Sequence, residues 1–336
     1  MKKFIYSTLI ICLLLTSLVG CSDVKRYVAY TVYPVGYLLN RIGGGRIETV
    51  SIQNNNLVQT ASVTSDYKKL LEDSTYLFHI GNLEPYFELY DDEIAESGVT
   101  QVDLSSLNAI YKFCRYTLVY VDGKESYVES PYYNGEVFEE IDVTDLDLSL
   151  WIDPIGMLSM AKDVYETLAS NYAEQSKYFK ENYDKLESDL IALDAAYQSL
   201  STKLKKENQT IKFVSMTPSF GNWQKAYGFQ VYPVCLSKYG AIPSDEEYEL
   251  IANRIKADGV QFIAYEPNMT DQMLQLFDRL EAELDLTRVN LYNISSLTPS
   301  QINENKDYMS LMYENLSVLE NMATTIIDNP IDVAGN

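Results

Sequence analysis

The stretch that decides the fold is AEQSKYFKENYDKLESDLIALDAAYQSLSTKLKK, residues 173–206. No glycine or proline interrupts it, and none occurs between Gly156 and Pro218. Leucine and aromatic side chains recur at alternating spacings of four and three, which places them on one face of a helix. They are Phe179, Tyr183, Leu186, Leu190, Leu193, Tyr197, Leu200 and Leu204. At 1.5 Å per residue this helix would be roughly 50 Å long, enough to cross two domains.

Strand and helix patterns alternate on both sides of this helix, which disfavours the simplest alternative, a coiled-coil arm. Short apolar runs typical of buried strands precede it at 27–32, 47–52, 76–80 and 100–104, and follow it at 211–216, 229–235, 260–265 and 288–292. Helical patterns lie between these runs. The sequence therefore predicts an α/β fold, with two lobes of mostly parallel sheet joined by one long, rigid spacer helix.

The length of 336 residues suits two domains of about 130–150 residues each. The predicted divisions are a signal peptide at 1–20, a lipidated tether at 21–26, an N-terminal lobe at 27–155, a helix pair at 156–209 that includes the spacer helix, and a C-terminal lobe at 210–336. Residues 122–146 break the alternation, because they are rich in tyrosine, glycine and acids. We expect a loop or an exposed hairpin there.

The first residues resemble a bacterial lipoprotein signal. Lys2 and Lys3 precede an apolar run over 4–19, and Leu18-Val19-Gly20-Cys21 resembles a lipobox, whose cysteine is lipidated and becomes the mature N-terminus. An uncleaved membrane anchor is the alternative, but the apolar run is short for a span. We therefore expect lipid attachment at Cys21 and an extracytoplasmic protein anchored to the cell membrane.

Composition excludes several classes of function. The net charge of −22 repels phosphate backbones, so nucleic acid is not expected as a partner. There is one histidine, no Gly-x-Ser-x-Gly motif and no glycine-rich loop that opens a helix, so an enzyme is not expected. Cys114 and Cys235 form no CxxC motif and are expected to be buried thiols, with their pairing left open.

Several short segments in order resemble one family. They are Tyr33-Pro34, Gly81-Asn82-Leu83-Glu84-Pro85-Tyr86, Leu150-Trp151-Ile152-Asp153-Pro154, Phe220-Gly221, Ile242-Pro243-Ser244, Tyr265-Glu266-Pro267 and Asp307-Tyr308-Met309. Together they resemble the cluster A-I substrate-binding proteins of ABC importers for zinc and manganese. The resemblance implies a monomeric two-lobed protein with a metal site between its lobes, an ABC permease as partner, and zinc or manganese as transported ligand rather than resident cofactor.

The family's metal ligands are replaced at all four matching positions. The first falls on Gln59 (or Val58 if the alignment shifts by one), and the others fall on Ser149, Thr217 and Asn293. Zinc and manganese are held by imidazole, thiolate and carboxylate groups, whereas these side chains offer only neutral oxygens or amides. We therefore expect the four residues to converge in the cleft and to bind no metal at the affinity of a dedicated importer.

His79 and Glu266 are the remaining candidate metal ligands. His79 ends a predicted strand beside Gly81, where bonding to a neighbouring carbonyl is the favoured interpretation. Glu266 precedes Pro267 after another strand, where local hydrogen bonding is favoured. The sequence thus indicates a binding lipoprotein of a metal-type ABC importer with an altered site. The alternatives are a different small polar ligand, or a surface lipoprotein that keeps the clamshell fold as an interaction module.

Overall fold

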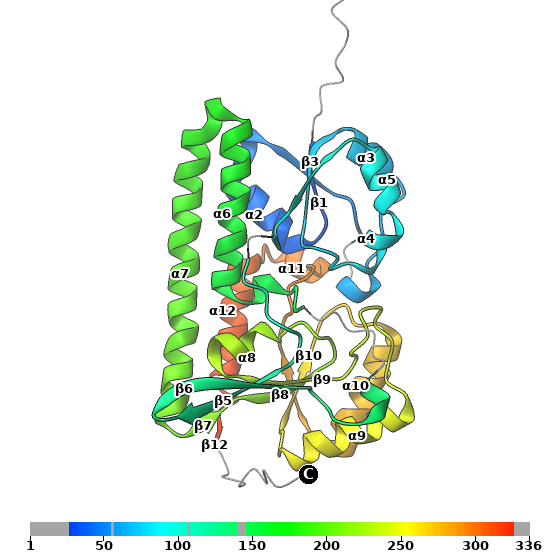
Figure 1. The fold of residues 1–336 in the computed structure, drawn as a ribbon, viewed down its shortest axis with the longest axis vertical. Helices are drawn as coiled ribbons and strands as arrows, with labels where there is room; N and C mark the ends of the chain where they lie inside the picture. Colours follow the sequence, from blue (N-terminus) through cyan, green and yellow to red (C-terminus); the bar gives the residue numbers. More distant parts are fainter. Residues whose placement is uncertain (1–26, 55–56, 107, 140–145, 326–336) are drawn as a thin grey trace, which may run out of the picture.

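The computed structural model of the protein describes residues 27–54, 57–106, 108–139 and 146–325. Two α/β lobes lie one above the other, and a layer of long helices runs along one side of both (Figure 1). The predicted fold class is confirmed. Within the described residues, no helix is both long enough and apolar enough to span a membrane.

The first lobe contains a four-stranded parallel sheet in the order β2-β1-β3-β4. Its strands are β1 (Tyr27–Tyr30), β2 (Glu48–Ser51), β3 (Ser74–His79) and β4 (Thr100–Asp103). Parallel strands need a crossover between them, and short helices supply it. These are α2 (Tyr33–Gly43), α3 (Tyr67–Glu72), α4 (Pro85–Leu89) and α5 (Asp91–Glu96), with the 3-10 turns η1 (Gly44–Arg46) and η2 (Val58–Thr60).

The second lobe repeats this design in the order β11-β10-β8-β9, again with all strands parallel. Its strands are β8 (Lys212–Ser215), β9 (Gln230–Pro233), β10 (Phe262–Tyr265) and β11 (Thr287–Asn290), and its helices are α8 (Asn222–Tyr227), α9 (Asp245–Ala257) and α10 (Asp271–Leu284). Numbered by their appearance in each lobe, the strands have the same spatial order, second-first-third-fourth. The two lobes therefore share one topology.

Two helix starts in the second lobe follow from local side-chain chemistry. Ser244 and Glu247 form a capping box at the start of α9, and the Thr270 hydroxyl accepts a hydrogen bond from the Met273 amide at the start of α10. Each cap satisfies backbone N–H groups that have no partner inside the helix.

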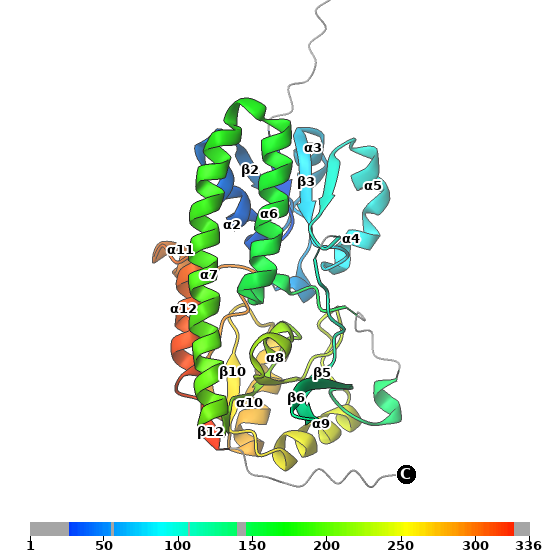
Figure 2. The same ribbon diagram turned by 60° about the vertical axis from the view of Figure 1, so that its left-hand side comes forward.

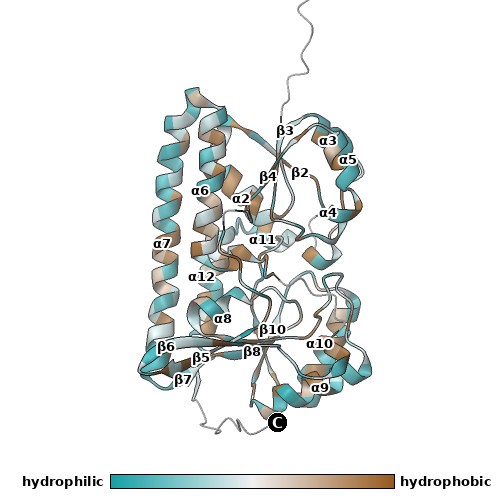
Figure 3. Ribbon diagram, viewed as in Figure 1, coloured by the Kyte–Doolittle hydropathy of each residue, from teal (hydrophilic) through white to brown (hydrophobic). Residues whose placement is uncertain are grey.

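The spacer helix α7 (Ser176–Lys206) runs antiparallel to α6 (Pro154–Asn171), and the two are visible side by side in Figures 1 and 2. All eight residues predicted for its apolar face are buried. Hydrophilic and hydrophobic residues alternate along it in Figure 3, as one packed and one solvated face require. Periodicity alone located this face.

Helix α7 contacts both lobes. Near its start, Asn182 Nδ2 donates to the Ile42 carbonyl at 3.1 Å in the first lobe. Further along, the Tyr197 hydroxyl donates to the Met312 carbonyl at 2.8 Å, and the Ser201 hydroxyl donates to the Tyr227 carbonyl at 2.7 Å. The helix therefore connects the lobes through packing and hydrogen bonds along its length.

The structure corrects the start of the predicted spacer helix. The spacer helix begins at Ser176 rather than at 173, because residues 173–175 form the 3-10 turn η5 (Ala173–Gln175) that reverses the chain after α6. The last helix is α12 (Tyr308–Leu319), preceded by the short α11 (Pro299–Asn303). After it, β12 (Thr324–Thr325) pairs antiparallel with β7 (Gln209–Thr210).

An exposed hairpin occupies part of the acidic, tyrosine-rich region. Strands β5 (Arg115–Val121) and β6 (Lys124–Ser130) pair antiparallel through a turn with positive φ at Asp122 and Gly123. Two-residue hairpin turns of this kind favour Asp-Gly. The turn η3 (Glu136–Phe138) follows the hairpin, and η4 (Leu150–Ile152) leads into α6. Residues 140–145 of this region lie outside the described residues.

Candidate functional site

The loops at the carboxyl ends of both sheets meet between the lobes. Val58 follows β2 and Leu83 follows β3, while Pro218 follows β8 and Lys238 follows β9, and all four line one pocket. Ligands of parallel α/β sheets bind at this edge, where loops carry side chains away from the strand ends. The topology therefore places the candidate site in the cleft.

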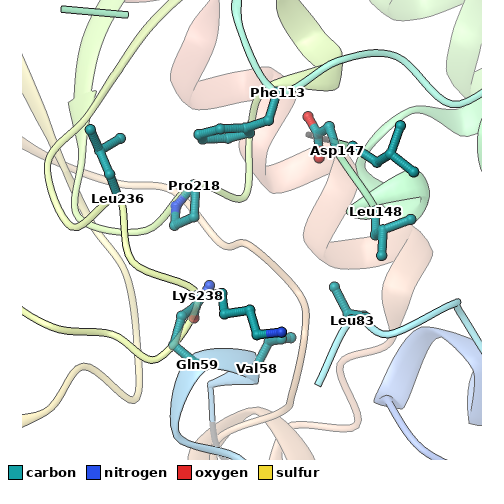
Figure 4. A pocket seen from close by; sticks show the side chains of 10 residues that line it. Val58, Gln59, Leu83, Phe113, Asp147, Leu148, Pro218, Leu236 and Lys238 are labelled. Carbon is teal, nitrogen blue, oxygen red and sulfur yellow. The ribbon is translucent and has the colours of Figure 1, made fainter. Parts of the chain in front are cut away.

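The pocket is mostly apolar and small (Figure 4). Its lining consists of Val58, Gln59, Leu83, Phe113, Leu146, Asp147, Leu148, Pro218, Leu236 and Lys238. The cavity volume is about 50 Å³, which is room for roughly three to five water molecules. In this arrangement of the lobes, the pocket admits only a ligand of a few non-hydrogen atoms.

Gln59 lies where its loop touches the other lobe. Gly240, in the loop after β9, has φ +70°, and a Cβ added there would lie 3.1 Å from the Cβ of Gln59. A larger residue at this position would be strained and would press on Gln59 and on Met273. Glycine thus allows the loops of the two lobes to approach across the cleft.

Thr217 and Asn293 converge on Glu266, which is fully buried. The amides of Met216 and Thr217 donate to Glu266 Oε1 at 2.7 and 2.9 Å, and Asn293 Nδ2 donates to Oε2 at 2.8 Å. The Thr217 hydroxyl also donates to Oε2. Burial raises the pKa of Glu266, and these hydrogen bonds oppose that rise. Four donors therefore already occupy this carboxylate.

Ser149 is held mainly through its backbone. Its amide donates to Asp147 Oδ1 at 3.1 Å, and its carbonyl accepts Asn222 Nδ2 at 3.1 Å. The same segment reaches Asn293, because Trp151 Nε1 donates to the Asn293 carbonyl at 2.7 Å. Gln59 lines the pocket, Ser149 and Thr217 each adjoin a residue that lines it, and Asn293 joins them through Glu266 and Trp151.

His79 makes the local contact that its position predicts. Its Nδ1 lies 3.1 Å from the Gly81 carbonyl oxygen, and its ring stacks on Phe87 with 4.5 Å between centroids. Burial lowers the pKa of His79, while the Gly81 carbonyl and Asp103 act in the opposite direction. The geometry describes a packed histidine at a strand end of the first lobe.

Two charged pocket residues were missed at the sequence level. Asp147 is buried. Burial raises its pKa to about 7, although hydrogen bonds from two backbone amides act in the opposite direction. Lys238 is 15% exposed, with Nζ 3.2 Å from Glu88 Oε1 across the cleft. A signal existed for Lys238, because it is the one cationic residue between Lys225 and Arg254.

A second buried glutamate was assigned no site role from the sequence. Glu84 is completely buried, and burial raises its pKa to about 7, only partly opposed by the nearby Thr31 hydroxyl. Neither Glu84 carboxylate oxygen nor the Thr31 hydroxyl has a hydrogen-bond partner of normal geometry among the described residues. Buried polar groups are rarely left in this state.

No group of three or more histidine, cysteine, aspartate or glutamate side chains is arranged to hold a metal ion in the part of the chain that the structure describes. Cys21, the expected lipid-attachment residue, lies outside the described residues. Cys114 is partly exposed and Cys235 is buried, and both are free thiols.

Known proteins resemble this chain in sequence and in fold. The family model for the periplasmic zinc-uptake complex component A (ZnuA) matches residues 28–322. The zinc-binding lipoprotein AdcA of Streptococcus pneumoniae is 22% identical over 332 residues, covering 95% of this chain and 61% of AdcA. The zinc-binding protein AdcA of Streptococcus pyogenes is 20% identical over 256 residues, covering 76% and 47%. The chain therefore spans less than two thirds of the length of these relatives.

Solved structures show the same fold at low sequence identity. The periplasmic zinc-binding protein TroA from Treponema pallidum matches with a TM-score of 0.66 and 16% identity, covering 89% of this chain and 99% of TroA. The laminin-binding protein Lmb of Streptococcus agalactiae, described as having adhesin and metal-transporting activity, matches with a TM-score of 0.68 and 14% identity, covering 88% and 99%.

Proposed function

We propose a function from the premise that this chain belongs to the family of the periplasmic zinc-uptake complex component A, whose model matches residues 28–322. It is an extracytoplasmic substrate-binding protein that delivers a ligand from the cleft to the permease of an ABC importer. The family and the relatives are named for binding and uptake, and we infer that this chain is likewise no enzyme.

The cargo that we propose is a small polar molecule in place of zinc or manganese. The observation that carries this is the Glu266 network: Thr217 and Asn293, which stand at two ligand positions of the family, donate hydrogen bonds to the one carboxylate beside them. The other two positions, Gln59 and Ser149, are neutral as well. Neutral groups compensate poorly for the hydration that a divalent cation loses on binding.

Lys238 supports the same conclusion. A fixed ammonium group lines the pocket, and like charges in a partly buried cleft repel one another. Repulsion from Lys238 lowers the affinity of the pocket for any divalent cation. A polar organic ligand faces no such penalty, because it can hydrogen-bond to amides and hydroxyls and can pair with the ammonium group.

Anchoring and domain limits are further parts of the proposal. Cys21 would carry the lipid, after removal of residues 1–20, and tether a monomer to the membrane beside its permease. The AdcA of Streptococcus pneumoniae is named a lipoprotein, which supports this assignment. We propose lobe limits of 27–155 and 210–336 around the helix pair at 156–209, with sheet strands β1 to β4 in the first lobe and β8 to β11 in the second. The β5–β6 hairpin lies within 27–155 in sequence but contacts the second lobe, where Arg115 pairs with Asp258 at 3.2 Å. Replacing Cys21 with alanine should release the protein from the membrane fraction.

The test of the cargo is zinc and manganese affinity, measured by chelator competition on the purified mature protein, beside a thermal-shift screen of small polar metabolites. We expect no tight metal binding and at least one stabilising metabolite. A quadruple variant with Gln59→His, Ser149→His, Thr217→His and Asn293→Asp is the positive control, because it restores the family's ligands. Tight, salt-insensitive zinc binding by the unmodified protein would overturn the proposal. Stabilisation by no compound would favour the alternative of an interaction module.

A further inference from the structure

The cleft pocket has two opposite charges on different walls. Figure 4 shows the Lys238 side chain extending toward Val58, while the Asp147 carboxylate lies near Phe113 on another side. The two side chains come from different segments, the loop after β9 and the segment before η4. A ligand in the pocket would therefore meet a positive group at one end and a carboxyl group at the other.

Lys238 and Asp147 differ in the groups with which they already interact. Lys238 pairs with Glu88, whose side chain is 51% exposed and sits at the solvent side. Asp147 accepts hydrogen bonds from the backbone amides of Ser149 and Asn222, and no lysine or arginine is paired with it among the described residues. Because burial disfavours the ionised form of Asp147 and no cationic side chain is paired with it, a cationic group that reaches Asp147 would favour the carboxylate and be stabilised there.

The space between the charges is apolar. Leu83, Phe113, Leu148 and Leu236 all contribute to the lining, and Gln59 adds one amide. The cavity of about 50 Å³ limits a ligand in this conformation to a few non-hydrogen atoms. These features fit a ligand that carries two opposite charges close together and has only a few other non-hydrogen atoms.

We propose that the pocket binds a small zwitterion, an α-amino acid of the size of glycine or alanine, with its carboxylate toward Lys238 and its ammonium toward Asp147. The inference rests on the proposed function, because it assumes that the cleft carries the cargo and that the cargo is not a metal ion. Both charges of such a ligand find a partner, and its net charge of zero matches the pair of opposite charges in the pocket.

Ligands with a single charge fit less well. A simple anion would pair with Lys238 and leave Asp147 uncompensated, whereas a simple cation would pair with Asp147 and face Lys238. A divalent metal ion would meet one carboxylate and one ammonium group in the same small space, which is a poor donor set for zinc. The pocket should therefore bind a simple anion or a simple cation more weakly than it binds a zwitterion.

The experiment is isothermal titration calorimetry of the purified protein with glycine and L-alanine, beside acetate and methylammonium as single-charge probes. We expect the amino acids to bind and each fragment to bind at least about tenfold more weakly, because each loses one charge-assisted contact. Lys238→Met and Asp147→Asn should each weaken amino-acid binding by about tenfold or more. Asp147→Asn keeps an oxygen to accept the Ser149 amide but loses the acceptor of the Asn222 amide, so its binding is compared with its melting temperature.

Two matched variants serve as controls. Lys69→Met removes an exposed lysine on α3 outside the pocket and should leave binding unchanged. Glu88→Gln removes the outer partner of Lys238 and should leave binding equal or tighter. Melting temperatures of all variants show whether a loss of binding reflects a loss of folding.

The inference would be overturned if wild type bound neither amino acid at millimolar concentration, if acetate or methylammonium bound equally well, or if Lys238→Met and Asp147→Asn folded normally and bound like wild type. Tight zinc binding would instead overturn the proposed function. A different metabolite that stabilises the protein, with no response to amino acids, would leave the proposed function standing and remove only this inference.

Discussion

Glu84 in the first lobe and Glu266 in the second hold corresponding places in two sheets of the same topology. Each follows the third strand of its lobe and precedes a proline, and each is 0% exposed. Each also has a threonine nearby that follows the first strand of the same lobe, Thr31 for Glu84 and Thr217 for Glu266. Sequence context and burial are therefore closely matched.

Their hydrogen bonds are not matched. Glu266 accepts from two backbone amides, a hydroxyl and the Asn293 amide, whereas neither oxygen of Glu84 has a partner of normal geometry among the described residues. In the first lobe a different acid serves as acceptor: Asp103 Oδ1 takes the amides of Gly81 and Ser105, both at 2.8 Å. The state of a buried acid thus depends on the donors that the fold aims at it, and local sequence does not reveal them.

The largest expected effect comes from removing each carboxylate in turn. Glu266→Met leaves three buried N–H donors without an acceptor and the Thr217 hydroxyl with only Ser219 as partner, and should lower the free energy of unfolding by about 3–5 kcal/mol. Glu84→Met removes a group with no good partner and should be neutral or stabilising, because the side chains have similar length. Urea denaturation of both variants measures the contrast, and equal losses would show that Glu84 has partners after all.

The second prediction concerns pH. The folded-state pKa of Glu84, about 7, lies above its unfolded value near 4.5. The folded state therefore holds a proton that the unfolded state has lost between these values, and stability falls as pH rises from about 4.5 to 7. At 1.36 kcal/mol per pKa unit, the loss is about 3 kcal/mol.

The variant Glu84→Gln isolates this contribution, because the acids Asp147 and Asp153, whose pKa values are also raised, are unchanged in it. Unfolding free energies of wild type and variant at intervals from pH 4 to pH 8 give the difference. The unfolding free energy of the variant should rise relative to that of wild type as pH rises, and the difference should be constant above about pH 7. A constant difference across the range would contradict the raised pKa.

The smallest effect should come from the two threonines. Thr217→Val removes a hydroxyl that bonds Glu266 and lies 2.7 Å from the Ser219 hydroxyl, and should cost about 1–3 kcal/mol. Thr31→Val removes a hydroxyl without a partner of normal geometry, and should change stability by less than about 0.5 kcal/mol. Thermal unfolding of the pair provides the measurement. A large loss of stability in Thr31→Val would indicate that the Thr31 hydroxyl donates a hydrogen bond to Glu84.

The sequence by itself determined the architecture. The spacing of eight apolar residues in 173–206 located the buried face of α7, because helical periodicity is a local property of the chain. The alternation of strand and helix patterns gave two parallel α/β lobes, and Ser244 and Thr270 marked helix starts through contacts three residues away. Identification of the family also followed from segments in order along the chain.

Only the tertiary structure decided what the cleft contains. The segment of Asp147, before η4, and the loop of Lys238, after β9, are about ninety residues apart, and only the folded chain brings them to one pocket. Glu266 gained four donors from two segments, at 216–217 and at Asn293, while Glu84, in a similar sequence context, gained none of normal geometry among the described residues. Charge pairing and hydrogen bonding depend on distances of a few ångströms between segments far apart in the chain, and no local pattern encodes those distances.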